Sequence, residues 1–228
     1  MRWATIPLAL LLGVPTARAS DYEARLAAQQ ADLLEGLTAK CPESKAEIEA
    51  VARASKAERA EKLAALARCG DHLELFHAAL GAAHMANEDF PAAEKSYRSA
   101  LKLRVTEAAQ VGLLTALVRQ KALSAAQKAD LAEHLAYFEE RTCSRDDLCA
   151  ALSYVAWHMD QHALTKRSAE RAIALGFPGW QPYFFGGAVY ALGGAEDRVK
   201  AVELLREAKR RSGPPVIDRL LADLGARD

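Results

Sequence analysis

The sequence predicts an all-α protein built from helical hairpins. Leucines recur at helical spacing, for example Leu26, Leu33 and Leu37. Valine, isoleucine and threonine form no alternating run, which argues against a sheet. Small residues return every 36 residues along much of the chain. A period of this length indicates that one supersecondary unit is repeated. With 228 residues, 51% of them hydrophobic, the chain is long enough to bury a sizeable core.

The first 19 residues resemble a secretory signal. Arg2 supplies the positive start, and residues 3–15 form an uncharged run that is too short to span a bilayer. Ala17-Arg18-Ala19 fits the small-x-small rule, so we expect cleavage between Ala19 and Ser20. An uncleaved anchor is the alternative. Cleavage would make the protein periplasmic or secreted.

The charge balance excludes several partners. The formal net charge is zero, and removing Arg2 and Arg18 leaves 28 basic against 30 acidic residues, a net charge of −2. Nucleic-acid binding requires a basic surface, so we expect no nucleic-acid partner. No later segment is long and apolar enough to cross a membrane, so no stable insertion is expected after cleavage.

Four cysteines remain after export: Cys41, Cys69, Cys143 and Cys149. An even number in an oxidising compartment indicates disulfides. We favour Cys41–Cys69, which would tie two neighbouring N-terminal helices. We also favour Cys143–Cys149, which would close a short loop at the start of a helix. Zinc is the alternative, but the spacings contain no C-x2-C pair.

Capping patterns place the N-terminal helices. Ser20, Ser44 and Ser55 are each followed three residues later by Glu, as in a capping box. Gly70 is expected to stop the third helix, and Asp71 to open the next with Glu74. The predicted helices are 20–40, 44–54, 55–68 and one that begins at 71–74.

Residues 77–103 read as two helices around a turn at 87–89, with Pro91 in the first turn of the second helix. Such a hairpin cannot bury its apolar stripe alone and needs a similar neighbour. The expected contact residues are Gly81, Ala93 and Ala100, together with the larger Leu80, Tyr97 and Leu101.

Further helices follow in order to the C-terminus. Ser124 with Gln127 is expected to cap one of them, and Pro214-Pro215 is expected to end the series. The predicted helices are 106–121, 124–140, 145–159, 162–175, 182–192, 197–211 and a final short one within 214–228.

Two columns of small residues set the repeat. Both columns would lie on one face of the second helix of each hairpin, because the seven residues that separate them make two helical turns. A small residue there lets the paired helix approach closely. The first column is Ala64, Ala100, Ala136, Ala172 and Ala208. The second, seven residues earlier, is Ala57, Ala93, Ala129, Thr165 and Ala201.

Two stretches carry a recognisable pattern. The first is Leu80-Gly81-x-x-His84 followed by Ala93, Tyr97 and Ala100. The second is Gly186-Gly187-x-x-Tyr190 followed by Gly193-Gly194, Ala201 and Ala208. The first resembles the tetratricopeptide repeat, with His77 and His84 in place of the usual bulky apolar residue and tyrosine. The second resembles the related Sel-like repeat.

The resemblance implies a right-handed αα-hairpin solenoid with capping helices. We expect a single domain over 20–228, with N-terminal helices in 20–70, hairpins in 71–212 and a capping helix in 214–228. It implies a non-catalytic scaffold that binds a peptide or protein on its concave face. The alternatives are a disulfide-containing Sel-like enzyme or binder acting on β-lactam or cell-wall ligands, and a purely structural envelope subunit.

No motif compels an enzyme or a cofactor. The chain lacks a G-x-S-x-G nucleophile motif and a Walker lysine. His158 and His162 are four residues apart, but Asp160-Gln161 falls where a turn belongs, so a surface turn is favoured over a shared metal ion. His77 and His84 are interpreted as packed core histidines.

Aromatic residues gather between 154 and 190. Eight lie within these 37 residues, more than two small hairpins usually need for packing. First helices line the concave face of such solenoids. We therefore expect part of the set to face a peptide-binding groove. The candidate residues are Tyr154, His158, Tyr183 and Phe184.

Overall fold

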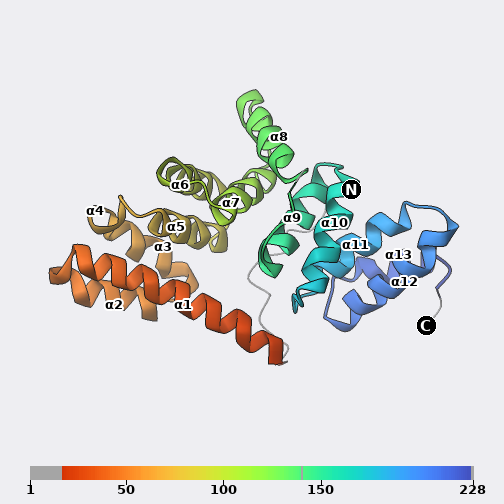
Figure 1. Cartoon of the computed structure of the whole chain (residues 1–228), viewed down its shortest axis with the longest axis horizontal. Helices are drawn as coiled ribbons and strands as arrows, with labels where there is room; N and C mark the ends of the chain where they lie inside the picture. The colour runs from red at the N-terminus through yellow and green to blue at the C-terminus, as the bar shows by residue number, and fades with distance from the viewer. Residues whose placement is uncertain (1–16, 140, 227–228) are drawn as a thin grey trace. The chain divides into compact units, whose positions relative to one another are not determined.

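A computed structural model describes residues 17–139 and 141–226, and all regular structure within this part is helical (Figure 1). The chain divides into two compact units, Met1–Gln127 and Lys128–Asp228. The prediction of one domain over 20–228 is not tested by this division and stays a prediction. No described helix is both long and apolar enough to cross a membrane.

Consecutive helices of the first unit pack against one another. α1 contacts α2 and α4, α3 contacts α5, and α5 forms a hairpin with α6 that α7 continues. The helices are α1 (Ala17–Lys40), the 3-10 turn η2 (Pro42–Ser44), α2 (Lys45–Arg53), α3 (Lys56–Ala65), α4 (Ala67–Gly70), α5 (Glu74–Ala86), α6 (Phe90–Leu103), α7 (Glu107–Val118) and the start of α8 (Ala125–Glu139).

The second unit repeats the same pairing. α9 packs on α10 and α11 on α12, while α10–α11 and α9–α11 contacts join the two hairpins. α13 packs on α12. This order is that of a helical hairpin array, as predicted. The helices are α9 (Asp146–His158), α10 (His162–Ala174), α11 (Gln181–Ala191), α12 (Ala195–Arg210) and α13 (Val216–Asp223).

The predicted signal peptide is not tested, because residues 1–16 lie outside the described part of the chain. α1 begins at Ala17 and continues through Ser20. The predicted Ser20 cap concerns a helix that would begin after cleavage, so it stays a prediction.

Two predicted caps are confirmed. Ser55 accepts a hydrogen bond from the amide of Glu58, and the Glu58 carboxylate accepts one from the amide of Ser55. Ser124 and Gln127 form the same reciprocal pair, at 2.9 and 3.2 Å. These caps are predictable because every atom involved lies within one helical turn.

Two other predicted caps are wrong. Ser44 is buried and caps nothing, because its hydroxyl accepts a hydrogen bond from Arg68 Nη2 of α4 at 2.9 Å. Asp71 does not open α5, which begins at Glu74 after Leu73 without a side-chain cap. In the first case a partner distant in sequence replaces the local one.

The columns of small residues hold in three of the five helices. Their members in α6, α10 and α12 are fully buried: Ala93, Ala100, Thr165, Ala172, Ala201 and Ala208. Their members in α3 and α8 are exposed: Ala57, Ala64, Ala129 and Ala136. The prediction is wrong there because larger apolar residues on another face of each helix are buried instead. These are Ala60 and Leu63 in α3, and Leu131, Leu135 and Phe138 in α8.

Tyr97 is the main packing residue between α5, α6 and α7. Its ring lies against Gly81 of α5 and Gly112 of α7, and a Cβ at Gly81 would come within 2.9 Å of the ring. Burial raises the pKa of the Tyr97 phenol. Glycine costs about 1 kcal/mol in a helix relative to alanine. The space for the ring explains why glycine stands at both positions.

The histidines of α5 are not core residues. His77 and His84 are only half-buried, whereas Phe76, one residue before His77, is 0% exposed. His77 Nε2 lies 3.0 Å from the carbonyl oxygen of Asp71. The interpretation as packed core histidines is wrong, because the large Phe76 side chain sets which face of α5 turns inward.

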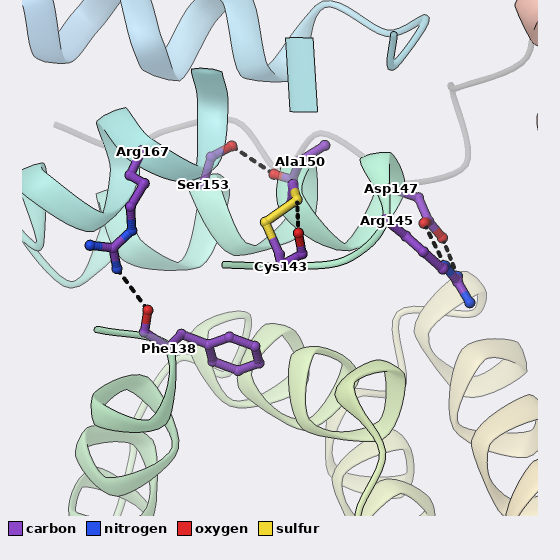
Figure 2. Close-up of a disulfide and its surroundings, with 8 residues drawn as sticks. Phe138, Cys143, Arg145, Asp147, Ala150, Ser153 and Arg167 are labelled. Atoms are coloured by element: carbon purple, nitrogen blue, oxygen red, sulfur yellow. Dashed lines mark hydrogen bonds and ion pairs between the residues drawn. A yellow bond between two sulfur atoms is a disulfide. The ribbon is translucent and has the colours of Figure 1, made fainter. Parts of the chain in front are cut away.

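Both predicted disulfides are present. Cys41–Cys69 joins the residue after α1 to α4, with Cα atoms 5.7 Å apart. Cys143–Cys149 closes the loop that leads into α9, with Cα atoms 5.4 Å apart (Figure 2). Such bonds are typical of oxidising compartments, which agrees with the expected export.

Glu94 of α6 is the centre of a polar network in the first unit. Its carboxylate accepts hydrogen bonds from Arg98 Nε at 2.9 Å and from the side-chain amides of Gln120 and Gln127, each at 2.7 Å. Burial alone would raise the pKa of this carboxyl, but the three hydrogen bonds and the charge of Arg98 outweigh it and lower the pKa. The network ties α6 to the segment that starts α8.

Glu94→Gln is expected to cost about 1–2 kcal/mol of unfolding free energy at pH 7, because charge-assisted hydrogen bonds are lost. A lowered folded-state pKa contributes stability that is present above the unfolded pKa and is lost as pH falls through the folded pKa. The difference from wild type should therefore shrink between pH 5 and pH 3. Urea denaturation of wild type and variant at pH 7 and at pH 3 measures this difference in unfolding free energy.

The exposed Glu133 of α8 offers a matched control, because its carboxylate makes no hydrogen bond or ion pair with the described residues. Glu133→Gln should change stability little at either pH. A Glu94→Gln effect that stays constant from pH 7 to pH 3 would contradict the assignment of this stability to the ionised carboxylate.

Candidate functional site

Aromatic side chains form the core of the second unit and extend to its surface. The buried part of this cluster comes from α11, α12 and α13, and residues of α9 pack against it. The buried members are Trp180, Tyr183, Phe184, Phe185, Leu204, Leu205, Ala208, Ile217 and Leu221. The cluster thus supports any aromatic side chain that α9 presents to solvent.

Two of the four predicted site residues lie within this core. Tyr183 is 9% exposed and Phe184 is 4% exposed. The guanidinium of Arg211 covers the Tyr183 ring at 4.3 Å and donates to the carbonyl of Pro178 at 2.7 Å. Both residues therefore contribute packing, and their predicted role in peptide binding stays a prediction.

The other two predicted residues lie together on α9. The rings of Tyr154 and His158 are 4.5 Å apart, on successive turns of the helix. Tyr154 is half-buried and His158 is exposed. Phe185 of α11 lies beneath them, with ring centroids 5.7 Å from Tyr154 and 6.5 Å from His158. The structure thus brings these two together at the surface.

Trp157 belongs to the same surface, although it is not one of the four predicted site residues. It is half-buried, with its ring 6.4 Å from Phe185 and 5.8 Å from His162. Helical spacing was the available signal, since Trp157 follows Tyr154 by three residues. We call Tyr154, Trp157 and His158 the α9 ridge.

The start of α9 is held rigidly by local contacts (Figure 2). The Cys143–Cys149 disulfide closes the preceding loop, and within it Arg145 donates to the Asp147 carboxylate at 2.6 and 3.0 Å. Arg167 of α10 donates to the carbonyl of Phe138 at the end of α8, at 2.7 Å. Further along, α9 packs on α10 and α11, and a packed helix holds the ridge side chains in place, which lowers the entropy cost of binding.

The two histidines considered as a metal pair lie on different helices. His158 ends α9 and His162 begins α10, and Asp160 between them has a φ of 55°, typical of a turn. Their rings contact different partners, Tyr154 and Trp157. Among the described residues, no group of three or more His, Cys, Asp or Glu is arranged to hold a metal ion.

Comparison with known proteins gives no relative. No family model matches the chain, and neither a curated protein nor a solved structure is significantly similar to it. The tetratricopeptide and Sel-like resemblance therefore stays a prediction, and the functional argument depends on the residues themselves.

Proposed function

We propose that this protein is an exported, non-catalytic interaction scaffold that binds a peptide or a protein surface through the α9 ridge. Its hairpins would form a right-handed solenoid of the tetratricopeptide or Sel-like type, in the periplasm or outside the cell. The sequential helix pairing and the two disulfides support this proposal.

The observation that carries the proposal is the α9 ridge. Aromatic side chains on a rigid helix, backed by a buried aromatic layer, supply a large contact area at a low entropy cost. Tyrosine and tryptophan are enriched among the residues that dominate binding at protein interfaces. The ridge is more accessible than Tyr183 and Phe184, so the proposed contact shifts from α11 to α9.

The two disulfides do not favour the β-lactam alternative. One joins residues 28 apart across the N-terminal helices, and the other closes a loop of sequence separation 6 before α9. The Sel-like proteins associated with β-lactams are expected to carry a regular cysteine pair in each repeat. The present pairs follow no repeat.

Combined Tyr154→Ala and His158→Ala substitution is expected to reduce recovery of the native partner at least tenfold, because truncating two central contacts costs about 1–2 kcal/mol each. The measurement is quantitative affinity recovery from envelope extracts of the producing organism, with mass spectrometry of the bound protein.

Tyr137→Ala in α8 is the matched control. Tyr137 is also half-buried, but it lies on α8 outside the α9 ridge, and Arg141 lies over its ring at 4.1 Å. It should recover as much partner as wild type. Equal recovery by all three proteins would contradict the proposed binding surface.

A further inference from the structure

Three half-buried aromatic rings in the described part of this chain are each covered by one of the chain's own cations. Arg119 lies 4.7 Å above Phe90, Arg141 lies 4.1 Å above Tyr137, and Lys166 lies 4.1 Å above Tyr190. Tyr190 also donates its hydroxyl proton to Glu170. A cation over a ring is stabilising, because the face of the ring is electrostatically negative.

Trp157 departs from this pattern. Tryptophan is the best cation-binding ring among the side chains, yet no Lys or Arg of the described residues covers it. Its described ring neighbours are Phe185 and His162. The indole N–H of Trp157 makes no hydrogen bond with another described residue, and the side chain is half-buried.

An unpaired carboxylate follows Trp157 by three residues. Asp160 is exposed, and its side chain forms no ion pair or hydrogen bond with the described residues. Its backbone amide donates to the carbonyl of Trp157 at 3.1 Å, so the turn brings the backbones of the two residues together. An aromatic π face and a carboxylate each complement a positive charge, and here they belong to residues joined by a backbone hydrogen bond.

We infer that Trp157 and Asp160 form a recognition site for a lysine or arginine side chain of the bound peptide. This inference depends on the proposed function, because the cation is supplied by the partner that the α9 ridge holds. The π face of Trp157 accepts the cation, and Asp160 pairs with it at the edge of the ridge. The site therefore selects basic peptide segments over neutral ones.

The test uses peptides selected from a random phage-displayed library on the purified wild-type chain. The affinity of each enriched peptide is measured by fluorescence anisotropy, together with a version in which its Lys or Arg is changed to Gln. In wild type this change is expected to weaken binding about 2- to 30-fold, corresponding to about 0.5–2 kcal/mol.

The same peptide pairs are then measured on Trp157→Leu and Asp160→Asn, with Glu133→Gln as a charge control. Asparagine tolerates the positive φ at position 160, so this variant removes the charge and keeps the turn. The loss of peptide affinity on changing Lys or Arg to Gln should be smaller on both site variants and unchanged on the control. This result is expected if the peptide cation contacts the two site residues directly.

Three outcomes are distinguishable. Enriched peptides without Lys or Arg, or a Lys-to-Gln effect that is unchanged on both site variants, would overturn the cation site. If the enriched peptides nevertheless lose affinity on the variant with Tyr154→Ala and His158→Ala, the proposed scaffold function stands without the cation site. If no peptide of the library binds the wild-type chain, the result counts against both proposals.

Discussion

Replacing Cys41 and Cys69 by alanine is expected to lower the unfolding free energy of the first unit by about 3–4 kcal/mol. The disulfide closes a loop with a sequence separation of 28, and the loss follows from the larger conformational freedom of the unfolded chain. Both cysteines are also buried, at 7% and 0% exposure, so small packing losses add to the effect. Hydrogen exchange followed by mass spectrometry reports the loss in α1, α2 and α4.

The second disulfide supplies the matched comparison. Cys143→Ala with Cys149→Ala opens a loop with a sequence separation of only 6, for which the same entropy argument gives about 2 kcal/mol. Its effect should appear at the start of α9. Equal losses for the two pairs would contradict the loop-entropy account and indicate that the packing of the sulfur atoms dominates instead.

Gly112→Ala is expected to destabilise the first unit by about 1–3 kcal/mol, although alanine normally favours helices over glycine. The added Cβ would overlap with the Tyr97 ring, which also lies against Gly81. The buried ring cannot rotate away without disturbing α5 and α6. Urea denaturation of the two proteins measures the difference.

A double-mutant cycle identifies the ring as the cause. Tyr97→Ala alone should cost about 3–5 kcal/mol, because it removes a buried aromatic side chain. In that background Gly112→Ala should become neutral or stabilising, since the space is open and the helix propensity of alanine then prevails. Additive losses would show that Gly112 is required for another reason.

Short-range signals predicted the helices well. The reciprocal caps at Ser55 and Ser124 use atoms within one turn, and the predicted turn at 87–89 lies between α5 and α6, with Pro91 in the first turn of α6. The two disulfides were also predictable, because the chain has only four cysteines and the favoured pairs join segments close in sequence. Each of these features depends on few residues, so distant packing seldom changes it.

Longer-range features were predicted less well. The alanine columns fail in α3 and α8, where Leu63 and Leu131 show which face is buried. Tyr183 and Phe184, which the sequence predicts for a groove, are core residues, and their role in peptide binding stays a prediction. Trp157 was not among the four predicted site residues. In a helix rich in aromatics, a shift of one residue turns a side chain by about 100°, and only the neighbouring helices decide its direction.

The sequence by itself determined an all-α chain, the order of its helices and its two disulfides. These follow from spacing, capping and cysteine count, which act over a few residues or over one covalent bond. The tertiary structure alone decided which aromatic rings reach solvent. Phe185 is buried beneath α9 and Tyr183 beneath Arg211, whereas Tyr154 and Trp157 are half-buried and His158 is exposed. The physical reason is that burial depends on which faces of separate helices meet, and this is set by packing across the whole unit.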